Sequence, residues 1–381
     1  MRILLAVNDP KEKYFDFVRG ALLPAHHEVY AAFAGKQGSL EPLAAAGKIK
    51  TVDWNLSDEE LSAIAEGTSG GELESLRKRI IASSGGQPFD VVILQSLSDE
   101  VSKIGAAFAG ETAHFLYTFF SDDELSPGTD RISRSICLEK AKFVVVSSDE
   151  IGRAFINETG SAYMNKLVRW RLGVGGLDDI DQSKRSISKS ECRRLFSEMF
   201  SNLLIVMGNE NDNSWHYEEA IEALKSIPRL LQTRLTVIID AAPESAEGRE
   251  YIAGLYNTLN GALFEYHVVE EPLGRENSAA LRCAADIYLH FPISGKITDE
   301  LTEYLYSETC ACFLKTDVDF VELERVGGEF YTFSDFSELP SIVEKVYKNR
   351  SYSYNSNSLR IRRAYSWDAA SPIWESLMRM K

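Results

Sequence analysis

Short apolar runs alternate with longer charged segments along the whole chain. Runs without polar interruption are typical of parallel strands that helices cover on both faces, and the charged segments between them have helical spacing. The runs predicted to form strands are 2–7, 28–33, 90–95, 114–119, 142–147, 203–207, 235–239, 263–269, 286–290 and 310–314. This pattern predicts an α/β protein built on parallel sheets.

The alternation breaks between residues 173 and 200. Gly173-Val174-Gly175-Gly176 does not suit a helix interior, and polar residues follow it. We therefore expect two doubly wound, Rossmann-like domains. Their predicted limits are 1–172 for the first domain, 173–200 for a linker, 201–350 for the second domain, and 351–381 for a crossing segment and C-terminal helix.

Charge and composition exclude several classes of protein. Among 381 residues, 41 Lys and Arg face 57 Asp and Glu, which gives a net charge of −16. An acidic chain is a poor partner for nucleic acid, because phosphate neutralisation needs a basic surface. The ordinary hydrophobic fraction of 44% excludes a disordered chain. At about 150 residues per domain, the length fits two domains.

Cysteine usage and hydropathy indicate the compartment. The five cysteines are scattered and odd in number, which favours the reducing cytoplasm. The apolar start, residues 1–7, is too short for a secretion signal, and no run approaches the roughly 18 apolar residues of a membrane helix. Any membrane contact is therefore expected to be peripheral, at the inner face. The basic residues of 77–79 and 184–194 suit an anionic membrane or a lipid-linked acceptor, although a solvated helix face is the default explanation.

A nicotinamide cofactor is not expected. Dinucleotide-binding folds place G-x-G-x-x-G directly after the first strand. Here that strand leads into Asn8-Asp9-Pro10, and no glycine follows until Gly20.

The second half of the chain carries a series of short motifs in a consistent order. They are Leu203–Gly208 with the helix start 217–223, 235–243 ending in Pro243, Ala284–Ser294 ("alanine-aspartate, strand, proline-serine"), the glutamate-bearing 303–306 with strand 310–317, 328–339, and Tyr365-Ser366-Trp367. This series resembles the donor domain of the retaining GT-B glycosyltransferases, and among these glycosyltransferase family 4, of which the chain looks like a divergent member. Residues 90–96 and 143–150 resemble acceptor-domain strands of the same family more weakly.

The resemblance implies a GT-B fold with two Rossmann-like domains facing a central cleft. It also implies metal-independent, retaining transfer of a sugar from a nucleotide sugar, expected to be a UDP-sugar, to a saccharide or lipid-linked acceptor in bacterial polysaccharide or glycoconjugate synthesis. In such enzymes the donor phosphate takes much of the base role, and positioning and phosphate stabilisation supply the rest.

Two family glutamates, eight residues apart, hold the sugar and the ribose of the donor. Counting back from the strand that leads to Asp317, the ribose glutamate falls on Glu303. The other falls near Gly295-Lys296, so we expect Asp299 to supply that carboxylate. The pair Glu300 and Glu308 has the right spacing but puts Cys310 too close behind it. Equally, these acids suit a solvated helix start, where the dipole favours them.

The phosphate-binding cations of the family are missing from this sequence. The loop after Gly208, residues 209–216, has neither the Arg nor the Lys that the family carries there. We expect amides near Thr298 and a residue such as Asn209 or Arg282 to bind the diphosphate. The predicted donor-binding residues are Glu303, Gly208, Asn209, Val268, Ser294, Thr298 and Glu300.

On the acceptor side, Asn8 and Asp9 follow the first strand and are predicted, with Asp299, to take part in catalysis. They lie where open parallel sheets place their ligands, although a simple Asn-Asp-Pro turn explains them equally well. The family often has a histidine after its fourth strand, where this chain reads Phe119-Phe120-Ser121-Asp122.

No metal or other cofactor is expected. Asp317-Val318-Asp319 resembles the DxD that binds a metal and a nucleotide sugar in GT-A enzymes, but too little chain follows it to build an acceptor half. Cys310 and Cys312 lie on a predicted buried strand without a second ligand pair, so we expect core packing there.

Two other functions fit the same pattern. A GT-B-like binding or scaffold protein without transfer activity is favoured by the missing phosphate cations, and a nucleotide-sugar epimerase uses the same fold. Binding and turnover of nucleotide sugars separate these alternatives.

Overall fold

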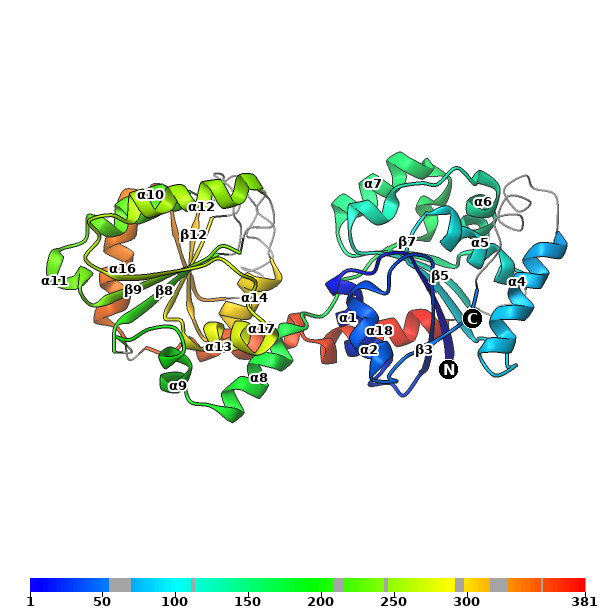
Figure 1. Cartoon of the computed structure of the whole chain (residues 1–381), viewed down its shortest axis with the longest axis horizontal. Helices are drawn as coiled ribbons and strands as arrows, with labels where there is room; N and C mark the ends of the chain where they lie inside the picture. Colours follow the sequence, from blue (N-terminus) through cyan, green and yellow to red (C-terminus); the bar gives the residue numbers. More distant parts are fainter. Residues whose placement is uncertain are drawn as a thin grey trace. The chain divides into compact units, whose positions relative to one another are not determined.

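The computed structural model describes residues 1–54, 70–110, 114–199, 201–208, 216–242, 246–291, 298–315, 328–350 and 352–380. The chain divides into two compact units (Figure 1). Unit 1 comprises Met1–Gly173 with Trp367–Lys381, and unit 2 comprises Val174–Ser366. Each unit is a parallel sheet between helical layers, so the prediction of two Rossmann-like, doubly wound domains is confirmed.

Unit 1 contains a seven-stranded parallel sheet in the order β3-β2-β1-β4-β5-β6-β7. The strands are β1 Arg2–Val7, β2 Glu28–Phe33, β3 Lys50–Thr51, β4 Val91–Leu94, β5 His114–Phe119, β6 Phe143–Val146 and β7 Leu167–Arg169. The helices are α1 Glu12–Phe17, α2 Glu41–Ala45, α4 Gly70–Ser83, α5 Asp99–Phe108, α6 Arg131–Lys140, α7 Asp149–Thr159 and α18 Trp367–Arg379, with the short turns η1 Val18–Leu22, η2 Gly38–Leu40, η3 Asp122–Leu125 and η4 Ser161–Lys166.

Unit 2 contains a six-stranded parallel sheet in the order β10-β9-β8-β11-β12-β13. The strands are β8 Leu203–Met207, β9 Leu235–Asp240, β10 Glu265–Val269, β11 Ile287–His290, β12 Cys310–Leu314 and β13 Phe330–Phe333. The helices are α8 Gly176–Ser186, α9 Lys189–Arg194, α10 Tyr217–Lys225, α11 Arg229–Gln232, α12 Ala246–Leu259, α13 Arg275–Ala284, α14 Asp299–Tyr306, α16 Leu339–Lys348 and α17 Asn355–Tyr365, with the turn η6 Phe336–Glu338.

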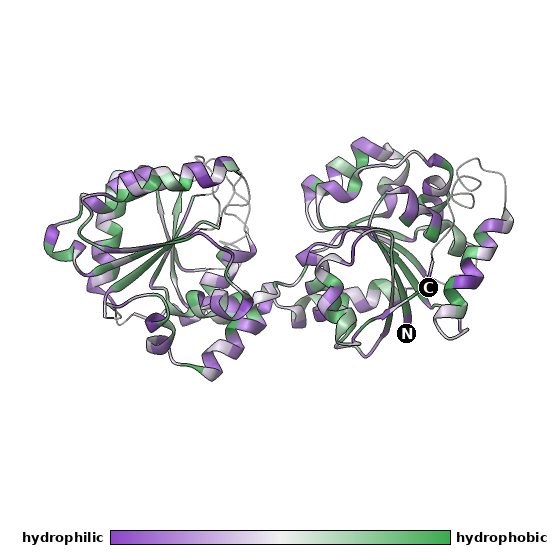
Figure 2. Cartoon of the chain, in the orientation of Figure 1, coloured by the Kyte–Doolittle hydropathy of each residue, from purple (hydrophilic) through white to green (hydrophobic). Residues whose placement is uncertain are grey.

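Both faces of each sheet are buried, which explains the continuous apolar runs. Along β8, Leu203, Ile205 and Met207 enter one core cluster, and Leu204 and Val206 enter the cluster on the opposite face. Successive side chains of a strand point to opposite faces, so a strand covered on both sides needs apolar residues at every position. Figure 2 shows the result, with apolar strands between helices that are apolar on one side and polar on the other.

Residues 174–199 differ from the predicted linker. They fold into α8 and α9 and belong to unit 2, where Leu177, Ile180 and Cys192 are buried in one core cluster. Their many charged residues occupy the exposed sides of two short amphipathic helices. The composition of this segment is therefore close to that of a linker, although the segment is folded.

The C-terminal helix α18 belongs to the core of unit 1. Trp374 is fully buried, and its ring centroid lies 4.5 Å from that of Phe17. At the start of the helix, Trp367 packs so closely on Gly20 and Gly173 that a Cβ at these positions would lie 2.2 Å and 2.5 Å from its ring. Glycine is required at both positions because any side chain would displace the indole.

Candidate functional site

In both sheets the strand order reverses beside the first strand of the unit. In unit 2 the reversal is at β8, which pairs with β9 on one side and with β11 on the other. Open parallel sheets bind ligands outside the carboxyl ends of the strands at such a point. In unit 2 these strands end at Met207, Asp240 and His290, and α14 begins shortly after β11. The carboxyl edge at β8, β9 and β11 is therefore the candidate ligand-binding edge.

Helix α14 begins with a side-chain cap and acidic residues in its first turn. Thr298 is the N-cap, and its hydroxyl accepts a hydrogen bond from the amide of Leu301 at 3.1 Å. Asp299 and Glu300 occupy the first turn, where the helix dipole favours negative charge. The acids here differ in environment, because Asp299 is exposed whereas Glu300 is only 6% exposed.

A buried guanidinium joins three carboxylates beside this helix start. Arg282 of α13 is 6% exposed, and its Nε donates to Oε2 of Glu303 at 3.0 Å. Its Nη2 lies 3.5 Å from Oε1 of Glu300, and its Nη1 lies 3.8 Å from Oδ2 of Asp240. One cation thus faces three acids from the end of β9 and from α14.

Aromatic side chains complete this cluster. The guanidinium of Arg282 lies 5.1 Å from the ring centroid of Tyr304, and Tyr304 stacks on Tyr288 at 4.0 Å. The Tyr288 hydroxyl donates to Oε2 of Glu300 at 2.8 Å and lies 3.3 Å from Nδ1 of His290. We call Asp240, Arg282, Tyr288, Glu300, Glu303 and Tyr304 the arginine–carboxylate cluster.

Burial sets the protonation behaviour of this cluster. Desolvation raises the pKa of Glu300 to about 7, against the opposing effect of the Arg282 charge. Burial also raises the pKa of Asp240, and the charge of Arg282 again opposes the shift. Three ionised carboxylates around one guanidinium would leave excess negative charge in a low dielectric, so protonation near neutral pH relieves it.

The structure brings some of the predicted donor residues together. Thr298, Asp299, Glu300 and Glu303 lie on the first turns of α14, and Glu303 and Glu300 share Arg282. Gly208 follows β8, and its carbonyl accepts a hydrogen bond from Tyr217 at 3.1 Å. Val268 is half-buried in β10, where it pairs with Ile239 of β9. Asn209 and Ser294, like Asp317 and Asp319, lie outside the described residues.

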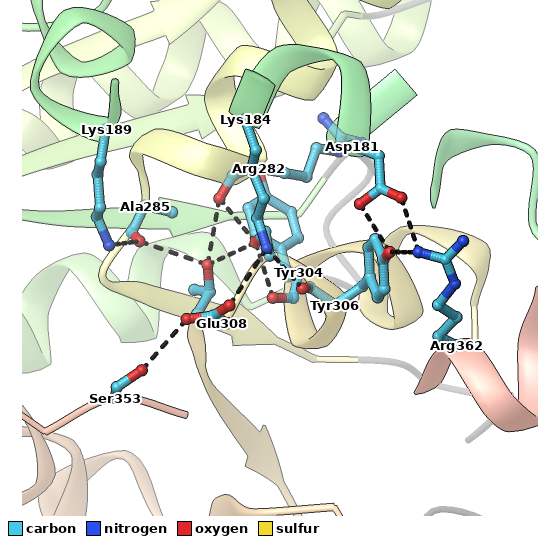
Figure 3. A network of polar contacts seen from close by, with 12 residues as sticks. Asp181, Lys184, Lys189, Arg282, Ala285, Tyr304, Tyr306, Glu308, Ser353 and Arg362 are labelled. Atoms are coloured by element: carbon cyan, nitrogen blue, oxygen red, sulfur yellow. Dashed lines mark hydrogen bonds and ion pairs between the residues drawn. The ribbon is translucent and has the colours of Figure 1, made fainter. Parts of the chain in front are cut away.

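The alternative glutamate Glu308 lies beyond the opposite end of α14. Figure 3 shows it directed toward Lys184 and Ser353, at distances of 3.5 Å and 3.2 Å between the polar atoms. Its backbone has a φ of 69°, a conformation that non-glycine residues rarely adopt. Glu300 and Glu308 therefore share the predicted spacing, but Glu300 lies in the first turn of α14 whereas Glu308 lies beyond its C-terminal end.

Arg282, a predicted ligand of the diphosphate, already forms ion pairs with carboxylates of this chain. Phosphate would have to compete with three carboxylates for a guanidinium that is 6% exposed. Its geometry instead suits the orientation of Glu300 and Glu303.

In unit 1, the predicted residues Asn8 and Asp9 lie at the carboxyl end of β1. The amide of Asn8 donates to Oε1 of Gln95 at 3.1 Å, and Asp9 accepts from the amide of Lys36 at 2.9 Å. Gly35 packs against both side chains, since a Cβ there would lie 2.7 Å from Oδ1 of Asn8. The two side chains thus belong to an ordered turn at the strand order reversal between β1 and β4.

Gln95 and Glu124 extend this edge and were missed by the sequence prediction. Gln95 donates to Oε1 of Glu124 at 2.8 Å, and Oε2 of Glu124 accepts the amides of Phe120 and Ser121. Burial raises the pKa of Glu124 to about 7, against the opposing effect of the Gln95 hydrogen bond. The Ser121-x-x-Glu124 spacing is that of a capping box and could have revealed the glutamate.

Two general features bear on cofactors and membranes. Within the described ranges, no three His, Cys, Asp or Glu side chains are grouped so as to hold a metal ion, and Cys310 and Cys312 are free thiols in the core. No helix in the part of the chain that the structure covers has the length and apolar composition to cross a membrane.

Comparisons with known proteins show the fold. Neither a protein-family model nor a curated protein sequence matches the chain. Among solved structures, it resembles a glycosyltransferase from Rickettsia africae, with a TM-score of 0.64, 15% identity and coverage of 100% and 99% of the two chains. It also resembles HepE from Anabaena in complex with UDP and glucose, with a TM-score of 0.62, 14% identity and full coverage of both chains.

A UDP-GlcNAc 2-epimerase from Neisseria meningitidis bound to UDP-GlcNAc is similar as well, with a TM-score of 0.59, 12% identity and 99% coverage of both chains. These similarities extend over both units and show that the chain has the GT-B fold. A fold of this kind is compatible with more than one chemistry.

Proposed function

We propose that this protein is a glycosyltransferase that moves a sugar from a nucleotide sugar, a UDP-sugar, to a saccharide or lipid-linked acceptor with retention of configuration. Placement in glycosyltransferase family 4, and a role in bacterial polysaccharide or glycoconjugate synthesis at the cytoplasmic face of the membrane, are part of this proposal. The observation that carries it is the position of Glu303 on α14, the helix that begins shortly after β11 of the candidate edge, where a buried arginine holds the carboxylate. UDP and UDP-GlcNAc in the structural neighbours support the choice of donor.

The chemistry assigned to unit 2 is recognition of the donor. A carboxylate accepts hydrogen bonds from both ribose hydroxyls, and charge-assisted hydrogen bonds of this kind are among the strongest in proteins. Amides at the start of α14, near Thr298, suit the diphosphate because a helix N-terminus favours anions. Asp299 at this helix start, and Asn8 and Asp9 in unit 1, are our proposed catalytic residues.

Two alternatives use the same fold. A scaffold protein without transfer activity is favoured by one observation: Arg282, a buried cation of the candidate site, already serves three carboxylates. A 2-epimerase would convert UDP-GlcNAc without an acceptor. Incubation with UDP-sugars, followed by chromatography of the products, distinguishes transfer or hydrolysis, epimerisation and no reaction.

The assignment of the ribose to Glu303 predicts a loss of affinity in the variant Glu303→Gln. Replacing the carboxylate by an amide removes charge-assisted hydrogen bonds, so UDP should bind about 10- to 150-fold more weakly, equivalent to about 1.5–3 kcal/mol. Isothermal titration calorimetry measures this, and Glu276→Gln on the exposed first turn of α13 is the matched control. Unchanged affinity in Glu303→Gln would move the ribose contact to Glu300 or Glu308.

Metal independence predicts that chelation leaves donor binding intact. A calorimetric titration with UDP-glucose in EDTA should give the same dissociation constant as one with Mg²⁺ or Mn²⁺, and Asp317→Asn with Asp319→Asn should leave it unchanged. Dependence of binding on an added divalent ion would instead assign the diphosphate to a carboxylate-bound metal.

A further inference from the structure

Glu303 is held from two sides by elements that precede it in the chain. On one side, Nε of Arg282 donates to its Oε2 at 3.0 Å. On the other side lies Gly176, the first residue of α8, where a Cβ would come within 1.9 Å of Oε1 and 2.4 Å of the carboxyl carbon. The carboxylate therefore fills the space that an alanine side chain would need.

Arg282 is itself rigidly placed. Its guanidinium lies against the ring of Tyr304 and also faces Glu300 and Asp240, while its backbone carbonyl accepts hydrogen bonds from the hydroxyls of Ser307 at 2.8 Å and Thr309 at 3.2 Å. Figure 3 labels Arg282 and Tyr304 among polar contacts that also include Lys189, Ala285 and Glu308. The backbone of Arg282 is held by these two hydrogen bonds and its guanidinium by the three acids and the ring, so few rotamers are open to the side chain that orients Glu303.

The same contacts act on the charge of Glu303. Asp240 and Glu300 repel a third negative charge nearby, whereas the guanidinium at 3.0 Å attracts it. An ionised carboxylate only accepts hydrogen bonds, which suits the two donor hydroxyls of a ribose. Recognition of a vicinal diol needs the carboxylate at a fixed angle, because both hydroxyls must be met together.

We propose that Arg282 and Gly176 form a clamp that sets the position of the Glu303 carboxylate and thereby makes the donor site select ribonucleotides over 2′-deoxyribonucleotides. Both are positioning residues: they act on the ligand through Glu303. The inference rests on the proposed function, since it assumes that Glu303 meets the ribose.

Gly176→Ala is the sharpest test of the clamp. The new methyl group meets the far end of a flexible side chain, so the helix can keep its place while the carboxylate moves. Gly254→Ala in α12 is the matched control, because a Cβ there has no atom within 4 Å. Arg282→Lys retains the charge but not the planar, anchored donor, and Arg282→Gln removes the charge.

The experiment is calorimetric titration of each full-length variant with UDP and with 2′-deoxy-UDP, with thermal unfolding as a check of folding. The wild type and Gly254→Ala should prefer UDP by about tenfold or more, equivalent to about 1.4 kcal/mol. In Gly176→Ala and Arg282→Gln, the affinity for UDP should fall to the affinity for 2′-deoxy-UDP. The affinity for 2′-deoxy-UDP should change little. Arg282→Lys should restore part of the preference.

Three results would overturn the clamp. If both nucleotides weaken by the same factor in Gly176→Ala, the glycine supports the fold and not the selectivity; if the preference is unchanged, Glu303 does not depend on it. If the wild type binds UDP and the variants keep its preference for UDP over 2′-deoxy-UDP, the clamp is refuted but the proposed function is not. Wild-type protein that binds neither nucleotide refutes the proposed function and the clamp together.

Discussion

Replacing Arg282 by leucine should lower the free energy of unfolding of unit 2 by about 3–5 kcal/mol, the range for breaking a buried ion pair by removing one partner. Arg282 is 6% exposed, and its guanidinium faces Asp240, Glu300 and Glu303. Without it, the three carboxylates must repel one another in the interior or take up protons. Native-state hydrogen exchange of the amides of β8, β9 and β11 reports this loss for unit 2 alone.

Arg275→Leu, in the same helix, is the matched control. Arg275 pairs with Asp179 at 3.4 Å with its side chain 36% exposed, so its replacement should cost about 0–1 kcal/mol. A similar small loss in Arg282→Leu would show that the cluster contributes little to stability. Such a result would also remove the physical basis for Arg282 as an anchor of Glu303.

The stability contributed by Glu300 should decrease as the pH rises. Its pKa is raised from 4.5 to about 7 in the folded protein, so the folded carboxyl binds its proton more tightly than the unfolded one. The resulting stabilisation is fully present below about pH 4.5 and is lost as the pH rises through about 7. Across this range the change is of the order of 3 kcal/mol, at about 1.4 kcal/mol per pH unit.

Urea denaturation of the wild type and Glu300→Gln at a series of pH values measures this effect. The stability of the wild type relative to the variant should decrease from pH 4.5 to pH 8, since glutamine does not titrate. Glu124→Gln in unit 1 should show the same trend, because burial raises the pKa of Glu124 to about 7 as well. A difference between wild type and Glu300→Gln that stays constant with pH would show that Glu300 keeps its ordinary pKa.

Most of the sheet architecture could be predicted from the sequence because both faces of each sheet are buried. All ten predicted runs form parallel strands with ends shifted by no more than two residues. Three strands lie outside these runs: β3 and β7, which have two and three residues without a buried position, and β13, which has one buried residue and lies within the 328–339 motif. Edge strands of this kind gain little from apolar side chains, so they leave no hydrophobic run.

The candidate site was harder to predict, because its charges come from separate elements. The motif series indicated Glu303 and the helix start at Thr298, but nothing in the sequence joins Arg282 in the last turn of α13 to Asp240 at the end of β9. Only the packing of α13 against α14 and the sheet brings them together. Gly176 falls within the predicted linker, whereas in the structure it is the first residue of α8 and lies beside the Glu303 carboxylate.

The most direct test of the nucleotide-sugar proposal is calorimetric titration of the full-length protein with UDP-glucose in the presence of EDTA, repeated with sugars of the other common nucleotides. We expect saturable binding of a nucleotide sugar with one site per chain, weakened about 10- to 150-fold in Glu303→Gln. We also expect slow release of the nucleoside diphosphate on incubation. Absence of both binding and turnover at saturating concentrations of all these donors would contradict it and leave a GT-B protein that acts as a scaffold.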